Sequence, residues 1–308
     1  MNINSFVQNI LIGYDKEFDD LSSLYKKNNF PNKLIFKGKK GSGKCTFAYH
    51  LINYIFSINE NHQYDLNKKL INESNNSYKL VLKNIHPNFF LIELKENKSM
   101  IDISQIREMI NFSNKTTLNN SIKVVLIDNS EYLNLSSINA LLKILEEPNE
   151  KLYFILIHDS KKKIPETIKS RCLVYNMNLN YKNKNDIVNS LININNKNNL
   201  VNYYSTPGEI VDLYNFCVNN DIDYMNIDIK EILIKISKSK ILKNSTYVKE
   251  NILNFMEMFI HNNILESNFD FKNYDVYKFF LKKIKLLKKY NLDIETLIIE
   301  FNSKFVNE

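Results

Sequence analysis

The sequence of 308 residues is 44% hydrophobic, 12% aromatic and 24% charged, which allows a substantial core and more than one domain and excludes wholesale disorder. No run of about 18 apolar residues is present, so no membrane span is expected. The net charge of +7 fits a partner that carries phosphates, without identifying one.

The first elements of the chain are a strand and a helix. The opening segment, MNINSFVQNILIGYDKEFDD, lacks the basic-then-apolar layout of a signal peptide, so a cytoplasmic location is expected. KLIFKG, at Lys33–Gly38, is a short apolar run that predicts a buried strand. CTFAYHLINYIFS follows with Phe47, Leu51 and Ile55 on one face, which predicts a helix.

Between this strand and helix lies a phosphate-binding pattern with one departure. Gly38, Gly43 and Lys44 meet the pattern G-x-x-x-x-G-K-[ST], but Cys45 stands where a hydroxyl is expected. Backbone N–H groups in such a loop form an anion site at the start of the helix, and Lys44 adds a charge for the phosphates. Mg²⁺ prefers hard oxygen ligands, so Cys45 is a poor substitute, and Thr46 points about 100° away. A loop that is kept for packing and stays empty is the alternative.

The middle of the chain continues the pattern. Residues 58–85 are polar and Asn-rich and give no clear prediction. Phe89–Leu94 predicts a second strand, and the helix after it begins with Asp102 and Gln105 at the spacing of a capping box. Val124–Ile127 gives the strongest strand signal of the sequence.

Asp128 ends that strand in the Walker B arrangement, in which a carboxylate binds Mg²⁺ through water. A strand-end residue that caps the next turn is the alternative. Many P-loop hydrolases have a glutamate next, which polarises the attacking water, but here the residue is Asn129. Glu131 follows two residues later, and the pattern assigns it no position. The candidate nucleotide-binding residues are Gly38, Gly41, Ser42, Gly43, Lys44, Cys45, Thr46 and Asp128.

Strand and helix patterns alternate up to about residue 179. SSINALLKILEEP predicts a helix that Pro148 stops, and Leu152–His158 predicts a strand. IPETIKSRC then predicts a short helix, and LVYNM a further strand. Strands this apolar are usually covered on both faces, so the alternation predicts an α/β fold with a parallel sheet. Beyond it the chain reads as helical, which predicts three domains, at residues 1–179, 180–222 and 223–308.

Arginine and cysteine are scarce enough to be informative. Of 41 Lys and Arg residues, only Arg107 and Arg171 are arginine, and a retained arginine indicates a need for its planar guanidinium, unless chance kept it. Arg107 is interpreted as a member of a structural ion pair, and a contact with a partner is the alternative. The cysteines Cys45, Cys172 and Cys217 are far apart, so neither a zinc site nor a disulfide framework is predicted.

Taken together, these segments resemble the core of bacterial clamp-loader subunits of DNA polymerase III, a family of AAA+ proteins. NALLKILEEP (Asn139–Pro148) and SRC (Ser170–Cys172) are the most specific parts. The N-terminal segment through GSGK, together with IHPNFFLIE and IDISQIREM, extends the resemblance over roughly residues 8–178. The resemblance implies a P-loop domain with a parallel sheet, a small helical lid that includes STPGEIVDL, and an all-helical C-terminal collar domain.

Two types of subunit occur in that family, and the chain resembles the stationary, delta prime type. The motor type, tau/gamma, has a zinc module with four cysteines, an intact GK[ST] and an acidic pair that ends Walker B. This chain has no cysteine between Cys45 and Cys172, and it has Asn129 in place of the glutamate. It has HDS (His158–Ser160) where the motor type has a sensor threonine, and PGE (Pro207–Glu209) where it has a lid arginine.

The resemblance also implies partners and a mechanism. Clamp-loader subunits form an open five-membered ring, so tau/gamma and delta subunits, the sliding clamp and primed DNA are expected partners. Arg171 is the expected catalytic residue, an arginine finger that acts in trans on ATP held by a neighbour. ATP or ADP is expected to bind weakly, Mg²⁺ only together with nucleotide, and zinc not at all. The polymerase activity belongs to the assembly.

Two alternatives remain open from the sequence. The chain is either such a scaffold subunit or an ATP-hydrolysing motor of the tau/gamma or helicase-like kind, and a nucleic-acid adaptor outside any loader is a third hypothesis. SKKKIPETIK (Ser160–Lys169) places four lysines near Arg171, which either contact DNA phosphates or form a solvated basic loop.

Overall fold

The computed structural model describes most of the chain in two compact units. One unit comprises residues 1–195 and 201–211, and the other residues 196–200 and 212–308. Within them, the described residues are 8–95, 98–115, 122–147, 149–192, 206–220, 271–290 and 294–305, with a few more between 252 and 264. No helix in these ranges is both long and apolar enough to cross a bilayer.

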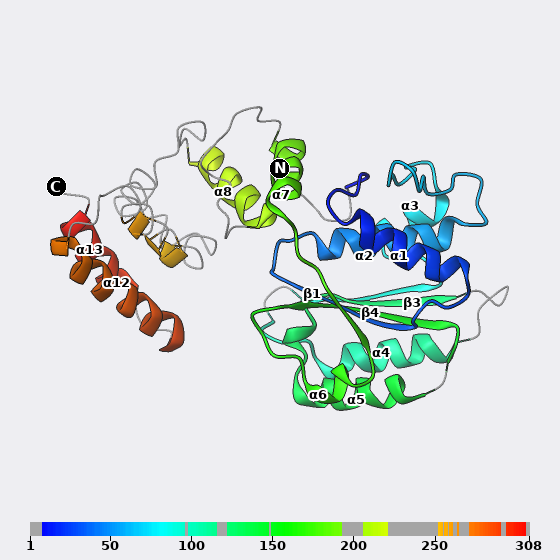
Figure 1. Cartoon of the computed structure of the whole chain (residues 1–308). Coiled ribbons are helices and arrows are strands. Elements are labelled where there is room, and N and C mark those ends of the chain that lie inside the picture. Colours follow the sequence, from blue (N-terminus) through cyan, green and yellow to red (C-terminus); the bar gives the residue numbers. More distant parts are fainter. Residues whose placement is uncertain are drawn as a thin grey trace. The chain divides into compact units, whose positions relative to one another are not determined.

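The first unit is built on a five-stranded parallel sheet (Figure 1). Its strands run in the order β2-β3-β4-β1-β5. β3 is buried along its whole length and β4 along most of its length, and both sequences are therefore nearly continuous apolar runs. The strands are β1 (Lys33–Gly38), β2 (Phe89–Ile92), β3 (Lys123–Ile127), β4 (Leu152–Asp159) and β5 (Leu173–Asn176).

Helices cover both faces of this sheet, as Figure 1 shows. On one face lie α1 (Asp15–Lys26), α2 (Lys44–Ser57) and α3 (Asn76–Leu82). On the other lie α4 (Ile103–Asn114), α5 (Leu135–Glu146) and α6 (Glu166–Lys169). The remaining described helices of the unit are α7 (Tyr181–Ile192) and the start of α8 (Pro207–Asn219).

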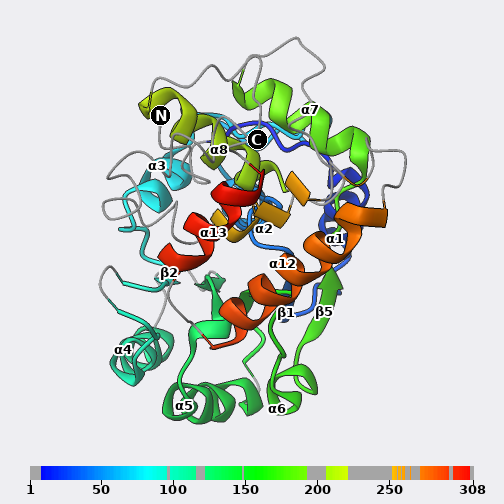
Figure 2. The same cartoon turned by 90° about the vertical axis from the view of Figure 1, so that its left-hand side faces the viewer.

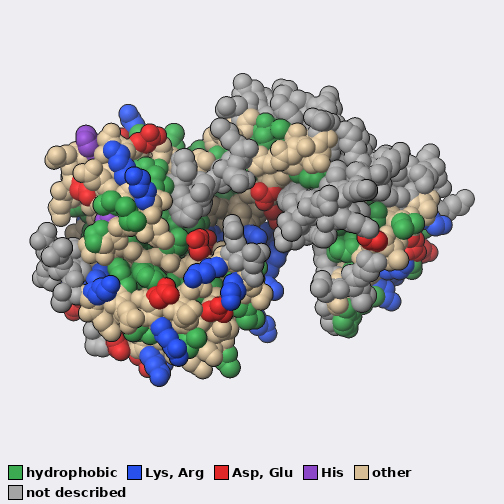
Figure 3. Space-filling model, turned by 180° about the vertical axis from the view of Figure 1, so that it is seen from behind, with side chains coloured by type: hydrophobic (Ala, Val, Ile, Leu, Met, Phe, Trp, Pro, Cys, Tyr) green, Lys and Arg blue, Asp and Glu red, His purple; other side chains and the backbone are tan. Residues whose placement is uncertain are grey.

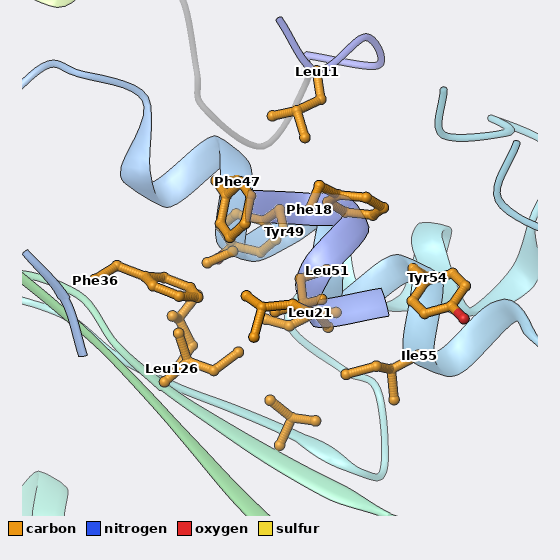
Figure 4. Close-up of a cluster of buried hydrophobic side chains, with 14 of the residues drawn as sticks. Leu11, Phe18, Leu21, Phe36, Phe47, Tyr49, Leu51, Tyr54, Ile55 and Leu126 are labelled. Carbon is orange, nitrogen blue, oxygen red and sulfur yellow. The ribbon is translucent and has the colours of Figure 1, made fainter. Parts of the chain in front are cut away.

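Aromatic side chains fill the core between the sheet and helices α1 and α2 (Figure 4). The Phe47 ring on α2 meets Phe36 on β1 edge-on at 5.0 Å and Phe18 on α1 at 6.0 Å between centroids. All three rings are fully buried, and such edge-to-face pairs stabilise a core by about 1 kcal/mol beyond their burial. This packing fixes α2, and with it the loop that precedes α2, against the carboxyl end of β1.

The polar segment 58–85 packs Tyr64, Ile71 and Val81 into the core and is further held by side-chain hydrogen bonds. The Asn75 side chain accepts from the Tyr78 N–H and so caps α3, and its Nδ2 donates to Glu60 at 2.6 Å. The Ser77 N–H also donates to Glu60, and His86 stacks on Phe56 at 4.3 Å. Among the described residues, no group of three or more His, Cys, Asp or Glu side chains is arranged to hold a metal ion.

The predicted capping box at the start of α4 is wrong. Asp102 is the N-cap residue, but its side chain makes no capping hydrogen bond and instead pairs with Lys98 at 3.3 Å. The Gln105 side chain donates to the Glu93 carbonyl oxygen at 2.9 Å, because that backbone acceptor competes for the amide. α5 ends at Glu146, and Pro148, predicted to stop it, lies outside the described residues.

The second unit is helical where it is described. α12 (Phe271–Tyr290) and α13 (Glu295–Phe305) pack through Phe280 and Phe301, whose rings lie 5.2 Å apart. Cys217, from the later part of α8, is fully buried in the same core. α8 runs from the first unit into the second, and the division into three domains at residues 179 and 222 stays a prediction.

Candidate functional site

The glycine loop between β1 and α2 has the backbone of a phosphate loop. Gly41 and Gly43 have φ values of 77° and 85°, the left-handed region that favours glycine. Gly43 is the N-cap of α2, so the unpaired N–H groups of the first helical turn face the loop. Gly38 is required for a different reason, since a Cβ there would lie 2.4 Å from the Met177 carbonyl oxygen.

Lys44 turns its ammonium back onto this loop. The side chain is buried, and Nζ donates to the carbonyl oxygens of Gly38 at 2.9 Å and Lys39 at 2.7 Å. Burial lowers the pKa of Lys44, and the carboxylates of Asp159, Glu131 and Asp128 oppose that shift. The ammonium of Lys44 is therefore held by two backbone carbonyl oxygens of the loop itself.

Cys45 and Asp128 contact each other across the site. Burial raises the pKa of Asp128, and hydrogen bonds from the Asn129 N–H and the Cys45 thiol oppose the shift. The Asn129 N–H lies 2.9 Å from Asp128 Oδ1. Thr46 makes no side-chain hydrogen bond to Asp128 or to any other described residue. The thiol thus occupies the place of the expected hydroxyl and satisfies the carboxylate that would otherwise serve a cation.

The loop fits a phosphate group, but its surroundings do not fit Mg²⁺. The Ser42 hydroxyl oxygen is buried and has no hydrogen-bond partner within the described residues, which leaves a polar group for an incoming ligand. Mg²⁺ needs hard oxygen ligands, and the Cys45 thiol, which stands in place of a hydroxyl and donates to Asp128, removes one of them. When bound, nucleotide would supply a phosphate chain, and Ser42, Gly43, Lys44 and the first turn of α2 would hold it.

Glu131 is a member of the site that the sequence pattern did not place. Its side chain is only 6% exposed, and Oε2 accepts from the Asp159 N–H at 3.1 Å. His158 Nδ1 lies 3.9 Å from the same oxygen and 3.0 Å from the Ser130 hydroxyl. Burial lowers the pKa of His158, and Glu131 opposes the shift. His158 and Asp159 therefore hold a buried carboxylate whose charge acts on Lys44.

The start of α8 lies directly on the glycine loop. The Gly208 N–H donates to the Gly41 carbonyl oxygen at 2.9 Å, and a Cβ on Gly208 would lie 2.7 Å from Gly41 Cα. Thr206 and Glu209 form a reciprocal capping box, with Thr206 N to Glu209 Oε2 at 2.8 Å and Glu209 N to Thr206 Oγ1 at 3.3 Å. The spacing T-x-x-E in the sequence is the pattern that indicates this cap.

Tyr14 is another residue of the site that no pattern in the sequence indicates. Its hydroxyl donates to the Ser42 carbonyl oxygen at 2.7 Å, and its ring packs on Phe47. Burial raises the pKa of Tyr14 well above its ordinary value. The residue braces the loop from α1, and no spacing in the sequence indicates that contact, because Tyr14 and Ser42 are 28 positions apart.

Arg171 lies at the opposite end of the strands from this loop. Leu173 is in register with Leu34 on β1, so Arg171, before the start of β5, lies near the amino end of the strands. The loop begins at Gly38, at the carboxyl end of β1. Six residues at about 3.3 Å each separate the two levels, or about 20 Å along the strands.

The two arginines differ in their surroundings. The Arg171 guanidinium donates to Glu146 Oε1 at 2.5 Å and to the Thr167 carbonyl oxygen at 2.8 Å. Arg107 is exposed on α4, and its guanidinium makes no hydrogen bond or ion pair with any described residue. The structural ion pair expected for Arg107 is therefore not found within the described ranges.

Comparisons with known proteins agree with this architecture. The model of a protein family described as "DNA polymerase III, delta subunit" matches residues 13–180. Over 166 residues the chain is 29% identical to DNA polymerase III subunit delta' of Buchnera aphidicola subsp. Schizaphis graminum, which covers 53% of this chain and 48% of that protein. Over 93 residues it is 41% identical to DNA polymerase III subunit gamma of the same organism, covering 30% of this chain and 25% of that protein. The chain thus spans about half or less of the length of these curated relatives.

A solved structure extends the likeness to nearly the whole chain. The crystal structure of a DNA polymerase III gamma subunit-related protein from Thermotoga maritima superposes with a TM-score of 0.51, over 92% of this chain and 97% of that one. The two sequences are 15% identical, so this likeness shows the fold alone. The expected α/β fold with a parallel sheet, followed by helices, is confirmed.

Proposed function

Because the chain belongs to the family described as "DNA polymerase III, delta subunit", whose matched relatives include proteins named subunit delta', we propose that it is the stationary member of a clamp loader. In this role it completes the ring, does not turn over ATP itself, and presents Arg171 to ATP bound by the adjacent subunit.

The observation that carries the proposal is the separation of Arg171 from the chain's own loop. About 20 Å of strand lies between the two, which no arginine side chain spans. Arg171 is nevertheless exposed, so a second molecule can approach it. A finger that reaches the transferred phosphoryl of a neighbour stabilises its developing charge, an effect of roughly 10³–10⁵ in rate.

The chain's own loop supports the non-hydrolysing half of the proposal. Asn129 carries no group that can act as a base at neutral pH, and the Cys45 thiol is hydrogen-bonded to Asp128. Lys44 is bonded to two loop carbonyl oxygens. A nucleotide held here, ATP or ADP, would bind weakly and without a well-formed Mg²⁺ site.

The wider assembly follows from the same proposal. The partners are tau/gamma and delta subunits in a hetero-pentamer, the sliding clamp, and primed DNA, in the cytoplasm. The four lysines of Ser160–Lys169 are exposed and suit contacts to DNA phosphates, which specify no sequence. Lys161–Lys163 follow β4 at the carboxyl end of the strands, and Lys169, at the end of α6, is the one near Arg171. Over the described part of the face in Figure 3, basic side chains lie among acidic ones. A contact with DNA through Ser160–Lys169 would therefore be a local one.

One observation favours the alternative of an ATP-hydrolysing subunit. Glu131 is a buried carboxylate whose charge acts on Lys44 of the glycine loop. Glu131 Oε2 accepts from the Asp159 N–H, which fixes the carboxylate, and Oε1 keeps its acceptor capacity for a water molecule. Steady-state ATP turnover by the purified chain, abolished by Glu131→Gln, would establish this alternative and refute the stationary role.

The proposed function is tested in a loader reconstituted from this chain, motor and delta subunits, clamp and primed DNA. Arg171→Ala is expected to leave assembly intact and to lower the DNA-stimulated kcat for ATP with little change in KM. Arg107→Ala is the matched control, since it removes the other exposed guanidinium and is expected to change neither. Arg171→Lys is expected to fail as well, because an ammonium lacks the planar fork. Unchanged turnover in Arg171→Ala would remove the finger role.

A further inference from the structure

The two sequence motifs that carry the resemblance meet in the folded chain. Glu146 is the last residue of α5, within NALLKILEEP, and Arg171 is the centre of SRC. Arg171 Nη2 lies 2.5 Å from Glu146 Oε1, although 25 positions separate the two residues. Figures 1 and 2 place α5 and α6 side by side on the same face of the sheet, which brings the two segments together.

Further acceptors hold the guanidinium from α6. Nη1 donates to the Thr167 carbonyl oxygen at 2.8 Å and to the Ser170 hydroxyl oxygen at 3.1 Å. Ser170 in turn donates to the same Thr167 oxygen at 3.1 Å, so it braces both groups. Cys172 packs into the core below, where burial raises the pKa of its thiol to about 11. Each residue of SRC therefore has a distinct structural role.

The guanidinium keeps free donors while it is held. An arginine has five N–H donors, and the described residues accept three hydrogen bonds from Arg171. The Nε–H is among the donors with no described acceptor. The side chain is 34% exposed, so these donors remain accessible to a second molecule.

The ion pair between Glu146 and Arg171 is weak enough to be broken. Glu146 is 56% exposed, and ion pairs this open to solvent contribute little to stability, because water and salt screen them. A phosphate group carries more charge than one carboxylate and accepts bidentate hydrogen bonds from a guanidinium. Arg171 can therefore leave Glu146 when a neighbour's phosphates arrive.

We propose that Glu146 is a positioning residue that holds the Arg171 guanidinium at the surface in the orientation from which it engages a neighbouring subunit's nucleotide phosphate. This inference rests on the proposed function. A free arginine side chain samples many rotamers, and catalysis by a finger requires one of them. By restricting that search, Glu146 raises the fraction of encounters in which the guanidinium is in place.

The test is Glu146→Gln in the reconstituted loader, with Glu147→Gln as a matched control. Glu147 is the adjacent exposed carboxylate, and no described residue pairs with it. The quantity measured is the Arg171-dependent turnover, the difference in DNA-stimulated kcat between wild type and Arg171→Ala. Glu146→Gln is expected to lower it about two- to fivefold without changing KM for ATP, and Glu147→Gln to leave it unchanged.

A double variant separates positioning from a purely structural effect. In an Arg171→Ala background, Glu146→Gln is expected to cause no further loss, because it acts only through Arg171. An equal loss in both backgrounds, or no loss in the wild-type background, overturns the inference. If Arg171→Ala itself changes nothing, the proposed function fails first, so the two failures are distinguishable.

Discussion

Replacing Gly208 by alanine tests whether the start of α8 is fixed on the glycine loop. Two effects of opposite sign act on this substitution. Alanine favours a helix over glycine by about 0.5–1 kcal/mol, which alone would stabilise α8. The added Cβ, however, would lie 2.7 Å from Gly41 Cα and 3.1 Å from the Gly41 carbonyl oxygen.

The size of the effect follows from these distances. Ordinary contact begins near 3.4 Å, so the two backbones must separate by at least 0.7 Å, the difference from 2.7 Å. The hydrogen bond from the Gly208 N–H, now 2.9 Å, is then stretched beyond its useful range. Overpacking costs about 1–3 kcal/mol and the lost hydrogen bond about 1 kcal/mol, so the net destabilisation is about 2 kcal/mol after the helix gain.

Amide hydrogen exchange of the full chain measures this local opening directly. A change of about 2 kcal/mol corresponds to roughly thirtyfold faster exchange at residue 208 in Gly208→Ala. Asn219→Ala is the control, since it changes an exposed position near the other end of the same helix without a clash. Exchange that is unchanged or slower in Gly208→Ala would show that helix propensity outweighs the contact and would refute the reasoning.

Two further predictions concern titration and metal dependence. Burial lowers the pKa of His50 to about 4, so the folded state keeps it neutral while the unfolded chain binds a proton below about pH 6.5. Stability is therefore lost as the pH falls from 6.5 to 4, by about 2 kcal/mol at pH 5 from this group, and urea unfolding of His50→Gln should show a smaller loss between pH 7 and 5. Cys45→Ser gives Mg²⁺ a hard oxygen ligand, so Mg²⁺ should strengthen ADP binding about tenfold in this variant and have little effect in wild type. Fluorescent ADP titrations with and without EDTA measure this, and a wild-type protein that is already Mg²⁺-dependent would contradict it.

The parts of the fold that local pattern determines were predictable from the sequence. β1, β3 and β4 are buried on both faces, so each is a continuous apolar run whose bounds the pattern gives to within a residue or two. The glycine loop was predictable because left-handed backbone at two positions demands glycine. β2 ends two residues earlier than predicted, at Ile92 rather than Leu94, because pairing with β3 stops there.

The contacts that shape the site were not predictable, because they join residues far apart in sequence. Tyr14 donates to Ser42, and Asp159 donates to Glu131. The fold brings the members of each pair together, although 28 positions separate them in the sequence. Arg171 was found by its scarcity, a signal of residue type, whereas its partner Glu146 is one of many glutamates and carries no such mark. Periodicity encodes a residue's own element and face, and it does not encode the partner.

The sheet explains how a chain can lose one activity and keep another. The departures at Cys45 and Asn129 lie at the carboxyl edge, whereas Arg171 lies at the amino edge, with about 20 Å of strand between them. Substitutions this far apart, without shared partners, act independently in most proteins. Substitutions in the glycine loop therefore leave the Arg171 guanidinium and its ion pair with Glu146 unaffected. On the proposed function, selection on Arg171 can continue after selection on the chain's own nucleotide chemistry has ended. The loop would keep a structural role in either case, because Tyr14 and Gly208 donate hydrogen bonds to it.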